Sequence, residues 1–421
     1  MFRTSFPRFI FGLIAIGSIW GQVPEVRITN SINAVQLRTL AGNVHPLARA
    51  AFDQGAAPSD LPMDRMLLVL TRGAAQEADL ETLLKAQQSP LSPQYHQWLT
   101  PQEFGARFGA ADEDIQAITN WLQTQGFTVN RVSNGKTIIE FAGTAGQIQR
   151  AFHTDIHKYV VNGTEHWANA SNPQIPAALA SVVAGVATLH NFTKQTQLTH
   201  SAQAFEAALS ANGRPQFNSS SGSYALSPGD YAIIYNLNPL LRAGINGTGR
   251  TIAVVGRTNI HVSDITDFRS TFGLPANNPN VIVNGVNPRD LGGDEEAEAV
   301  LDTTWAGATA PGATVDLVIS KTTNTTDGVD LSEEYIIDNN LADVMTESFG
   351  DCEANYTQAE AAMYTSLAQQ AAAQGITYFV AAGDSGSAGC NSGSDNTSDG
   401  KVSVNVLASN PYVVAVGGTE F

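Results

Sequence analysis

Apolar and polar positions divide the first half of the chain into short strands and amphipathic helices. Between about residues 44 and 192, apolar runs predict strands, and segments with apolar residues every three or four positions predict helices. The pair Asn134-Gly135 predicts a hairpin turn. The expected elements are strands at 65–73 and 155–161, helices at 77–87, 112–126 and 144–152, and a hairpin at 127–143. This pattern predicts a compact α+β unit.

From Tyr224 onward the pattern changes to strongly apolar strands with helical segments between several of them. It is typical of a parallel sheet that helices cover on both faces, because such strands are buried on both sides. The expected strands lie at residues 251–256, 314–320, 342–348, 376–383 and 412–418. Active sites in sheets of this kind gather at the carboxyl ends of the strands.

Two segments differ from these folded units. Arg3 and Arg8 precede an apolar run at 9–20 that is too short to cross a bilayer and is typical of a secretory signal. Residues 193–223 are polar and end in SSSGS, as expected of an exposed, cleavable linker. We therefore expect a secreted protein, without a membrane span after signal removal, divided into a signal peptide (1–22), a first domain (23–192), a linker (193–223) and a second domain (224–421).

Composition adds expectations about partners and cysteines. The 39 acidic and 22 basic residues give a net charge of -17, which disfavours binding to nucleic acid or anionic lipid. The carboxylate excess suits a protein that works in acid, and it equally serves solubility. In an exported chain Cys352 and Cys390 are expected to form a disulfide near two strand ends, although two buried, unreactive thiols would also fit.

An unusual pair of carboxylates marks residues 292–313. This segment predicts a helix that Asp294 caps and that ends at Pro311. Glu298 and Asp302 lie one turn apart on it, in a stripe with two large apolar side chains. Such a pair would share a proton and could act as a general base in acid, where histidine is protonated. An acidic first turn that complements the helix dipole is the alternative, and it explains this pair poorly.

The segment GDSGS, residues 383–387, resembles the nucleophile loop of trypsin-like proteases. Those enzymes need a histidine base on antiparallel barrels, whereas His261 is the only histidine of the second domain and the pattern here is α/β. Ser385 is therefore expected to be a loop residue and not a nucleophile.

Longer motifs resemble the sedolisins, also called serine-carboxyl peptidases or kumamolisin-like proteases. EAVLDTTWAGATAPGA, ADVMTESFG, VAAGDSGSAG and SNPYVVAVGGT occur in the order typical of the family. YHQWLTPQEF, IQRAFHTDIHKY and IPAALASVVAGVATL resemble its activation prodomain. The resemblance implies an α+β ferredoxin-like prodomain at 23–192, followed at 224–421 by the N-terminal part of a subtilisin-like α/β catalytic domain with a parallel sheet and helices on both faces.

The resemblance also implies roles for single residues. Glu298 matches the general base, Asp302 the carboxylate that supports it, and Asp384 the aspartic acid that completes the oxyanion hole, for which it must be protonated. Gly256 and Phe349 stand where some members have a glutamate and a tryptophan. The nucleophilic serine of the family lies in a GTS motif further downstream, so no serine here matches it and the chain alone is expected to be inactive. Calcium is expected from the family, with ligands outside this chain.

These features predict a secreted, acid-acting serine-carboxyl endopeptidase proenzyme. We expect a monomer that cleaves proteins or peptides and is inhibited by its own prodomain until acid loosens their carboxylate contacts. Endopeptidase action is expected in preference to release of tripeptides. The alternative is a non-catalytic truncated homologue that acts as an inhibitor or binding protein. A reading frame that continues past Phe421 with a GTS motif and an aspartate-rich loop would favour the enzyme.

Overall fold

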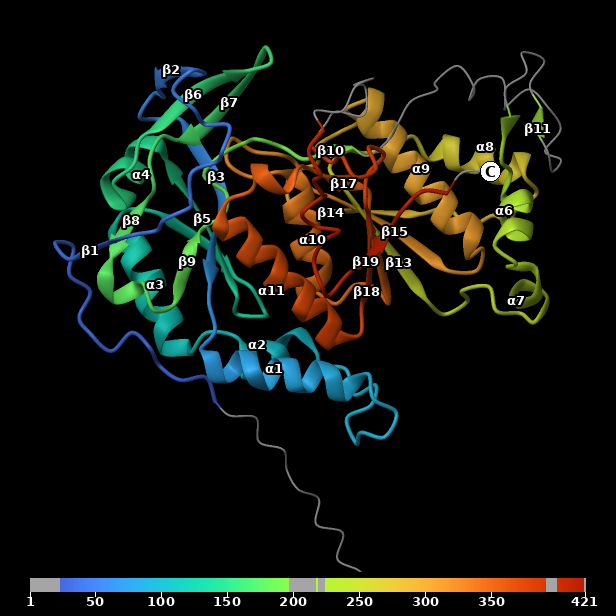
Figure 1. Cartoon of the computed structure of the whole chain (residues 1–421), viewed down its shortest axis with the longest axis horizontal. Coiled ribbons are helices and arrows are strands. Elements are labelled where there is room, and N and C mark those ends of the chain that lie inside the picture. The colour runs from blue at the N-terminus through green and yellow to red at the C-terminus, as the bar shows by residue number, and fades with distance from the viewer. Residues whose placement is uncertain (1–22, 197–216, 219–223, 391–399, 420–421) are drawn as a thin grey trace, which may run out of the picture.

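A computed structural model describes residues 23–196, 217–218, 224–390 and 400–419 (Figure 1). The expected signal peptide and most of the expected linker lie outside these ranges. Two packed units are visible, a first unit from residues 23–192 and a second unit from residue 224 onward. None of the helices in the described ranges has the length and apolarity that crossing a bilayer requires.

The first unit is built on a four-stranded antiparallel sheet with the order β4-β5-β3-β9. Helices connect β3 to β4, and α4 connects β5 to β9, so the connectivity and strand order are those of a ferredoxin-like fold. The bounds are β3 (Pro62–Leu70), β4 (Thr128–Val132), β5 (Ile138–Thr144), β9 (Val183–Val186), α3 (Asp112–Thr124) and α4 (Ala145–Phe152). The predicted α+β unit and its hairpin are confirmed.

Alternation along β3 explains why both faces of this sheet are covered. Met66 and Leu68 point into a core with α3 and α4, where Trp121 and Phe152 pack edge to face at 5.3 Å between ring centroids. Leu67 faces the second unit and shares a core with its helices. The sheet therefore joins the two units through its second face.

Smaller elements complete the first unit. Two helices, α1 (Ala74–Gln87) and α2 (Pro101–Phe108), pack against α11 of the second unit through a small apolar cluster. The remaining elements are β1 (Leu37–Thr39), β2 (Asp53–Ala56), β6 (Ile156–Val161), β7 (Thr164–Asn169), β8 (Gln174–Pro176) and the 3-10 turn Ala177–Leu179.

The second unit has a six-stranded parallel sheet with the order β14-β15-β13-β16-β18-β19. The bounds are β13 (Thr251–Gly256), β14 (Asn280–Val283), β15 (Thr314–Ile319), β16 (Val344–Glu347), β18 (Thr377–Ala381) and β19 (Val414–Val416). All five predicted strands are present, and β14 is the sixth. It escaped prediction because it is a short edge strand whose residues are exposed or half-buried.

Helices cover both faces of this sheet, as predicted. Val254 of β13 packs with α8 (Val262–Thr271) and α9 (Gly293–Thr309) on one face. Its neighbour Val255 packs with α10 (Gly328–Asp338) and α11 (Gln358–Gln374) on the other. α10 and α11 thus lie between the two sheets (Figure 1).

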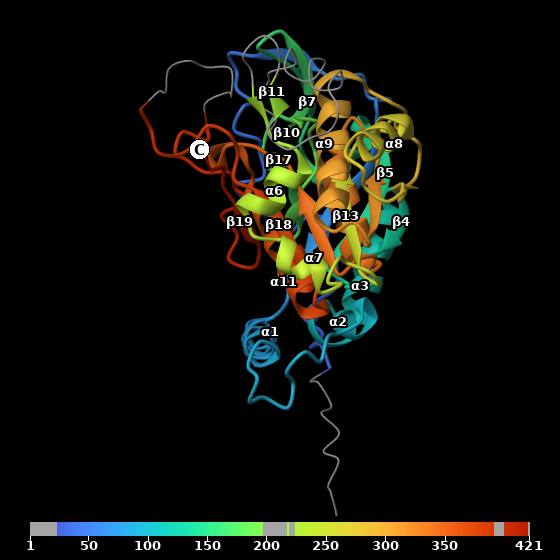
Figure 2. The same ribbon diagram turned by 90° about the vertical axis from the view of Figure 1, so that its right-hand side faces the viewer.

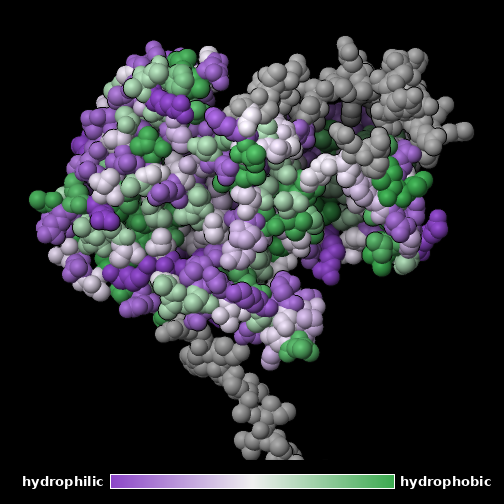
Figure 3. Space-filling model, viewed as in Figure 1, coloured by the Kyte–Doolittle hydropathy of each residue, from purple (hydrophilic) through white to green (hydrophobic). Residues whose placement is uncertain are grey.

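The remaining elements lie around the sheet. Helices α6 and α7 are at the end of the molecule far from the first unit, and face the viewer in Figure 2. Hydrophilic and hydrophobic residues are interspersed over the face seen in Figure 3. The bounds are α6 (Pro228–Ile234), α7 (Asn238–Arg242), β10 (Gln195–Thr196), β11 (Phe217–Asn218), β12 (Tyr224–Ala225), β17 (Phe349–Gly350) and the 3-10 turn Glu353–Asn355.

Two local expectations need correction. α9 begins two residues earlier than predicted, with Gly292 at its cap in a left-handed conformation (φ 65°), so Asp294 belongs to the first turn and is not the cap. The start of the polar segment 193–223 is not exposed throughout. Lys194 is 4% exposed, and β10 is paired in a small sheet. Lys194 is buried because it contacts buried carboxylates of the second unit, which the local sequence pattern does not reveal.

The aromatic core of the first unit gives a stability test. Phe141 is fully buried and packs against Phe127 at 5.2 Å between ring centroids. We expect Phe141→Ala to lower the free energy of unfolding by about 3–5 kcal/mol, because it leaves a cavity. Leu91→Ala, at a side chain that is 96% exposed, is the control and should change little. Urea denaturation measures both, and equal midpoints would contradict this core assignment.

Candidate active site

Helix α9 places the predicted carboxylate pair against the carboxyl ends of the strands. Ala299 anchors this helix in the core under the sheet, and the preceding Glu298 is only 2% exposed. One turn later, Asp302 Oδ1 accepts a hydrogen bond of 2.9 Å from Ser348 Oγ. Ser348 directly follows β16, so the pair lies where parallel sheets place their active sites.

The environment of Asp302 favours its neutral form. Burial raises the pKa of Asp302 to about 7, and the hydrogen bond from Ser348 only partly offsets this effect. Oδ2 is shielded from solvent and has no hydrogen-bond partner among the described residues. In acid Asp302 therefore carries a proton and adds no second negative charge beside Glu298. This arrangement suits a general base at Glu298.

Asp384 lies in the loop that follows β18, at the same edge of the sheet. Gly383 has a φ of 95° and turns the chain out of the strand, a conformation that favours glycine. Asp384 is exposed, and Ser385 beside it is half-buried. The assignment of Asp384 to an oxyanion hole stays a prediction, since a nucleophile would have to complete that site.

A disulfide joins the loop of Asp384 to the loop that follows β17. Cys352 and Cys390 are bonded in the structure, with their Cα atoms 4.5 Å apart. Their loops come together because β16 and β18 are neighbours in the sheet. The bridge limits how far the loop that carries Asp384 can move.

The acidic first turn of α9 is engaged in ion pairs. Glu295 pairs with Arg257, and Glu296 Oε1 lies 2.7 Å from His261 Nδ1. His261, Asp264 and Glu296 place candidate metal-ligand atoms within 4.8 Å of one another. One imidazole and two carboxylates do not fit calcium, which takes six to eight oxygen ligands. The calcium expectation therefore receives no support from this cluster.

The two positions that depart from some sedolisins are tightly packed. Phe349 is buried, and the guanidinium of Arg257 lies 5.1 Å from its ring centroid. A Cβ at Gly256 would lie 3.1 Å from Leu317 Cδ1, and the Gly256 carbonyl accepts a hydrogen bond from Ser332 Oγ. A longer side chain at Gly256 would require its neighbours to move.

Sequence reasoning missed a buried ionic cluster beside β13, β16 and α10. Lys194 pairs with Asp330, and Arg257 pairs with Asp327 at 3.0 Å. All four side chains are at most 7% exposed. The segment DGVDLSEEYIID, residues 327–338, indicated buried carboxylates, because acidic residues alternate with apolar residues along one predicted helix. No local signal marked Lys194.

Further ion pairs join the two units. Arg131 of β4 pairs with Glu334 and, at 3.3 Å, with Asp338, both on α10. His190 Nε2 lies 3.2 Å from Glu360 Oε1 on α11. Burial acts to raise the pKa of Glu360, but His190 and hydrogen bonds from Thr357 outweigh it and lower this pKa. The first unit thus supplies Arg131 and His190 as partners for buried carboxylates of the second.

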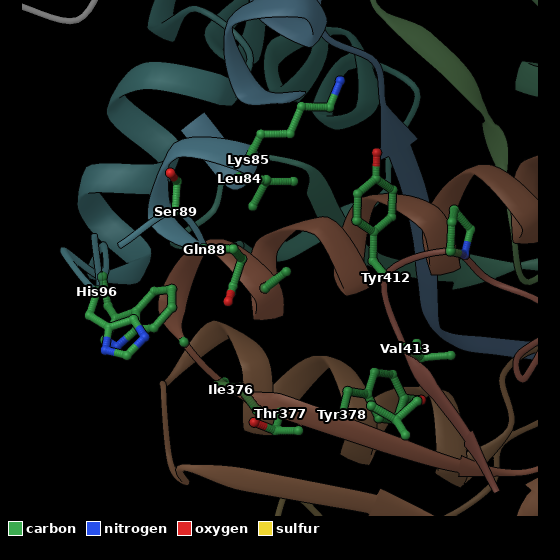
Figure 4. A pocket seen from close by; sticks show the side chains of 15 residues that line it. Leu84, Lys85, Gln88, Ser89, His96, Ile376, Thr377, Tyr378, Tyr412 and Val413 are labelled. Atoms are coloured by element: carbon green, nitrogen blue, oxygen red, sulfur yellow. The ribbon is translucent and has the colours of Figure 1, made fainter. Parts of the chain in front are cut away.

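A cavity of about 800 Å³ lies between α1 and the edge of the second sheet (Figure 4). It is lined by Leu84 and Lys85 of α1 and by Thr377 and Tyr378 of β18. Thr377 and Tyr378 are at the amino end of β18, whereas Glu298 and Asp302 face the carboxyl ends of the strands. The cavity is therefore separate from the candidate active site.

Comparison with known proteins gives the class of this molecule. The family description "Pro-kumamolisin, activation domain" matches residues 50–192. Sedolisin of Pseudomonas sp. (strain 101) is 28% identical over 84% of this chain and 59% of its own length. Xanthomonalisin of Xanthomonas sp. (strain T-22) is 29% identical over 90% of this chain and 49% of its own length. Kumamolisin of Bacillus sp. (strain MN-32) is 26% identical over 90% of this chain and 66% of its own length.

The chain spans about half to two thirds of the length of these relatives. A solved structure of Pseudomonas sedolisin, a serine-carboxyl proteinase complexed with two molecules of pseudo-iodotyrostatin, is 26% identical and covers 45% of this chain and 53% of its own, with a TM-score of 0.36. The activation-domain match and the three relatives support a peptidase family whose members have an activation domain. These matches support the assignment of the chain to the sedolisin family, as its motifs predicted.

The raised pKa of Asp302 makes a prediction about stability. A carboxyl whose folded-state pKa is about 7, against a usual 3.8, binds its proton more tightly when folded. Its contribution to stability is therefore complete below about pH 4 and is lost as the pH rises towards 7. Asp302→Asn should reduce this loss by roughly 1–2 kcal/mol, as one pKa unit corresponds to about 1.4 kcal/mol and the site keeps some solvent contact.

Urea unfolding at several pH values measures this difference. Asp294→Asn, at an exposed position in the first turn of α9, is the matched control. Identical pH profiles for Asp302→Asn and the unsubstituted protein would contradict the raised pKa.

Proposed function

We propose that this chain contains the activation domain and part of the catalytic domain of a secreted, acid-acting serine-carboxyl endopeptidase made as a proenzyme. The observation that carries the proposal is the buried Glu298, one turn before Asp302, whose pKa of about 7 keeps it neutral in acid. Family membership supports peptide substrates. Secretion rests on the signal-like sequence of residues 1–22.

The proposed mechanism assigns one task to each carboxyl group. Glu298 accepts the proton of the serine hydroxyl as its oxygen attacks the peptide carbonyl. Asp384 is assigned as the carboxyl group whose hydroxyl would donate a hydrogen bond to the oxyanion that forms. Glu298 then delivers its proton to the leaving amine, and later takes one from the water that hydrolyses the acyl-enzyme. The serine itself is not assigned to any of the 421 residues.

Asp302 acts in this mechanism through Glu298. With Ser348 donating to Oδ1, its own proton is available for a hydrogen bond to a neighbouring acceptor. A neutral Asp302 also avoids the repulsion that a second carboxylate would impose on an ionised Glu298. Asp302 is therefore a positioning residue for the base.

The activation domain is proposed to inhibit the enzyme until acid releases it. The contact of His190 with Glu360 joins the two units, and the pKa of Glu360 is lowered in the joined state. Protonation of Glu360 as the pH falls therefore weakens binding. Glu334 acts in the opposite sense, because burial raises its pKa to about 7 despite Arg131, so its protonation favours the joined state. Protonation of Glu360 and of other interface carboxylates weakens the joined state, whereas protonation of Glu334 strengthens it. Release in acid therefore requires the weakening to be larger than the strengthening.

Glu298→Gln tests the general base. In the complete gene product that contains this chain, we expect peptide cleavage in acid to fall by about 10²–10⁴-fold, the usual contribution of a general base. Glu296→Gln makes the same change one half-turn away at the His261 contact, and should retain activity. A fluorogenic peptide assay measures kcat/KM. Unaltered activity of Glu298→Gln would overturn the assignment, and a gene product that binds peptides without cleaving them would favour the non-catalytic alternative.

Arg131→Met tests how the activation domain is bound to the second unit. The substitution removes ion pairs with Glu334 and Asp338, so the second unit should be released at a pH about one unit less acidic. Arg150→Met, on the exposed side of α4, is the control. The measurement is the fraction of activation domain that separates from the second unit in size-exclusion chromatography at each pH. Release that does not vary with pH would remove the acid step from the proposal.

A further inference from the structure

The segment that leaves the activation domain crosses the candidate active site as an extended strand. β10 pairs antiparallel with β17, with Gln195 opposite Gly350 and Thr196 opposite Phe349. β17 directly follows Ser348, the hydrogen-bond donor to Asp302. α9 also contacts β10. Extended peptides bind proteins by adding a strand in this manner, with main-chain bonds for affinity and side-chain pockets for specificity.

Lys194 anchors this strand by both its main chain and its side chain. Its N–H donates to Asp327 Oδ2 at 2.8 Å, and its carbonyl accepts from Arg257 Nη2 at 2.9 Å. Its ammonium group pairs with Asp330 and lies 4.9 Å from the ring centroid of Tyr364. The next residue, Gln195, is exposed. One side chain of the strand thus enters a deep pocket while its neighbour points outward.

The pocket is made entirely by the second unit. Asp327 caps α10 and Asp330 lies in its first turn, Tyr364 is on α11, and Arg257 follows β13. These elements are held by the core around the parallel sheet. The residues that form the pocket therefore all remain in the second unit when the activation domain is removed.

An empty pocket would lack the cation that Lys194 supplies. Arg257 stays with Asp327, but Asp330 would retain only the hydrogen bond that Tyr364 Oη donates at 2.9 Å. Two further carboxyl groups that act on Lys194, Glu333 and Glu347, are fully buried. A buried carboxyl group without a cation either stays charged at a cost or takes up a proton, and a positive group from outside would restore the ion pair that Asp330 makes in this structure.

We propose that the Lys194 pocket is a substrate subsite that selects a lysine side chain in the peptide to be cleaved. In the proenzyme, the segment 193–196 occupies the substrate strand position, and Lys194 fills this subsite. After the activation domain leaves, a substrate peptide pairs with β17 and places its own lysine against Asp330 and Tyr364. The role of the pocket as a substrate subsite rests on the proposed peptidase function. Its preference for a positively charged side chain rests on the pocket residues alone.

A binding experiment tests the pocket without relying on catalysis. The protein is the complete gene product after removal of the activation domain, in mildly acidic buffer. The probes are two fluorescein-labelled peptides, NFTKQT, which reproduces residues 191–196, and NFTMQT, in which methionine replaces the lysine. We expect the lysine peptide to bind about tenfold or more tightly in fluorescence anisotropy, because a charge-assisted bond is lost with methionine. Equal affinities would overturn the subsite.

Variants identify the carboxylate responsible. Asp330→Asn should bring the affinity for NFTKQT close to that for NFTMQT. Asp338→Asn changes a carboxylate to an amide on the same helix, at the Arg131 contact, and should leave the lysine preference intact. A preference that survives in Asp330→Asn would contradict the pocket. The comparison of the two peptides on the unsubstituted protein needs no variant, so a misfolded variant does not affect it.

A cleavage series separates this inference from the proposed function. Fluorogenic peptides in which one lysine is moved along an otherwise constant sequence should show a rise in kcat/KM of about tenfold or more at a single position. Cleavage with no preferred lysine position would reject the subsite and retain the peptidase. Lysine-dependent binding without any cleavage would reject the peptidase and retain the pocket.

Discussion

Ionisable side chains buried at the carboxyl ends of the parallel strands are the constraint on which the rest of the structure depends. Each such group must be neutral or paired, because an isolated buried charge is expensive. Asp302 meets this requirement by holding a proton, with Ser348 donating to its other oxygen. Asp330 meets it by pairing with Lys194. The same edge of one sheet therefore holds both the carboxyl pair of Glu298 and Asp302 and a site for a cation.

This requirement also joins the two units. The carboxylates of α10 and α11 face the first unit, which supplies Arg131 from β4 and His190 from the segment after β9. The apolar core continues across the same boundary from β3 to α10 and α11. Apolar contact gives the interface its strength, and the ionic contacts make that strength depend on pH. This pH dependence is consistent with the proposed release of the activation domain in acid.

Much of the fold could be predicted from the sequence, because local patterns carry it. The apolar strands of the second unit and the hairpin at Asn134-Gly135 follow from periodicity and turn chemistry, and the structure contains them. The helical spacing also singled out Glu298 and Asp302. The edge strand β14 was missed because its residues are half exposed, and the cap of α9 was misplaced because glycine at Gly292 makes no side-chain signal.

By itself, the sequence determined the two folding units, the family, and the presence of two carboxylates on one face of α9, because these depend on residues close together in the chain. Only the tertiary structure decided which partners those groups meet. The order of strands in the sheet places Ser348 within hydrogen-bond distance of Asp302. Lys194 is buried because it binds Asp327 and Asp330, which lie at the start of a helix distant in sequence. The charge of a site depends on neighbours that are remote in sequence, and local patterns contain no record of them.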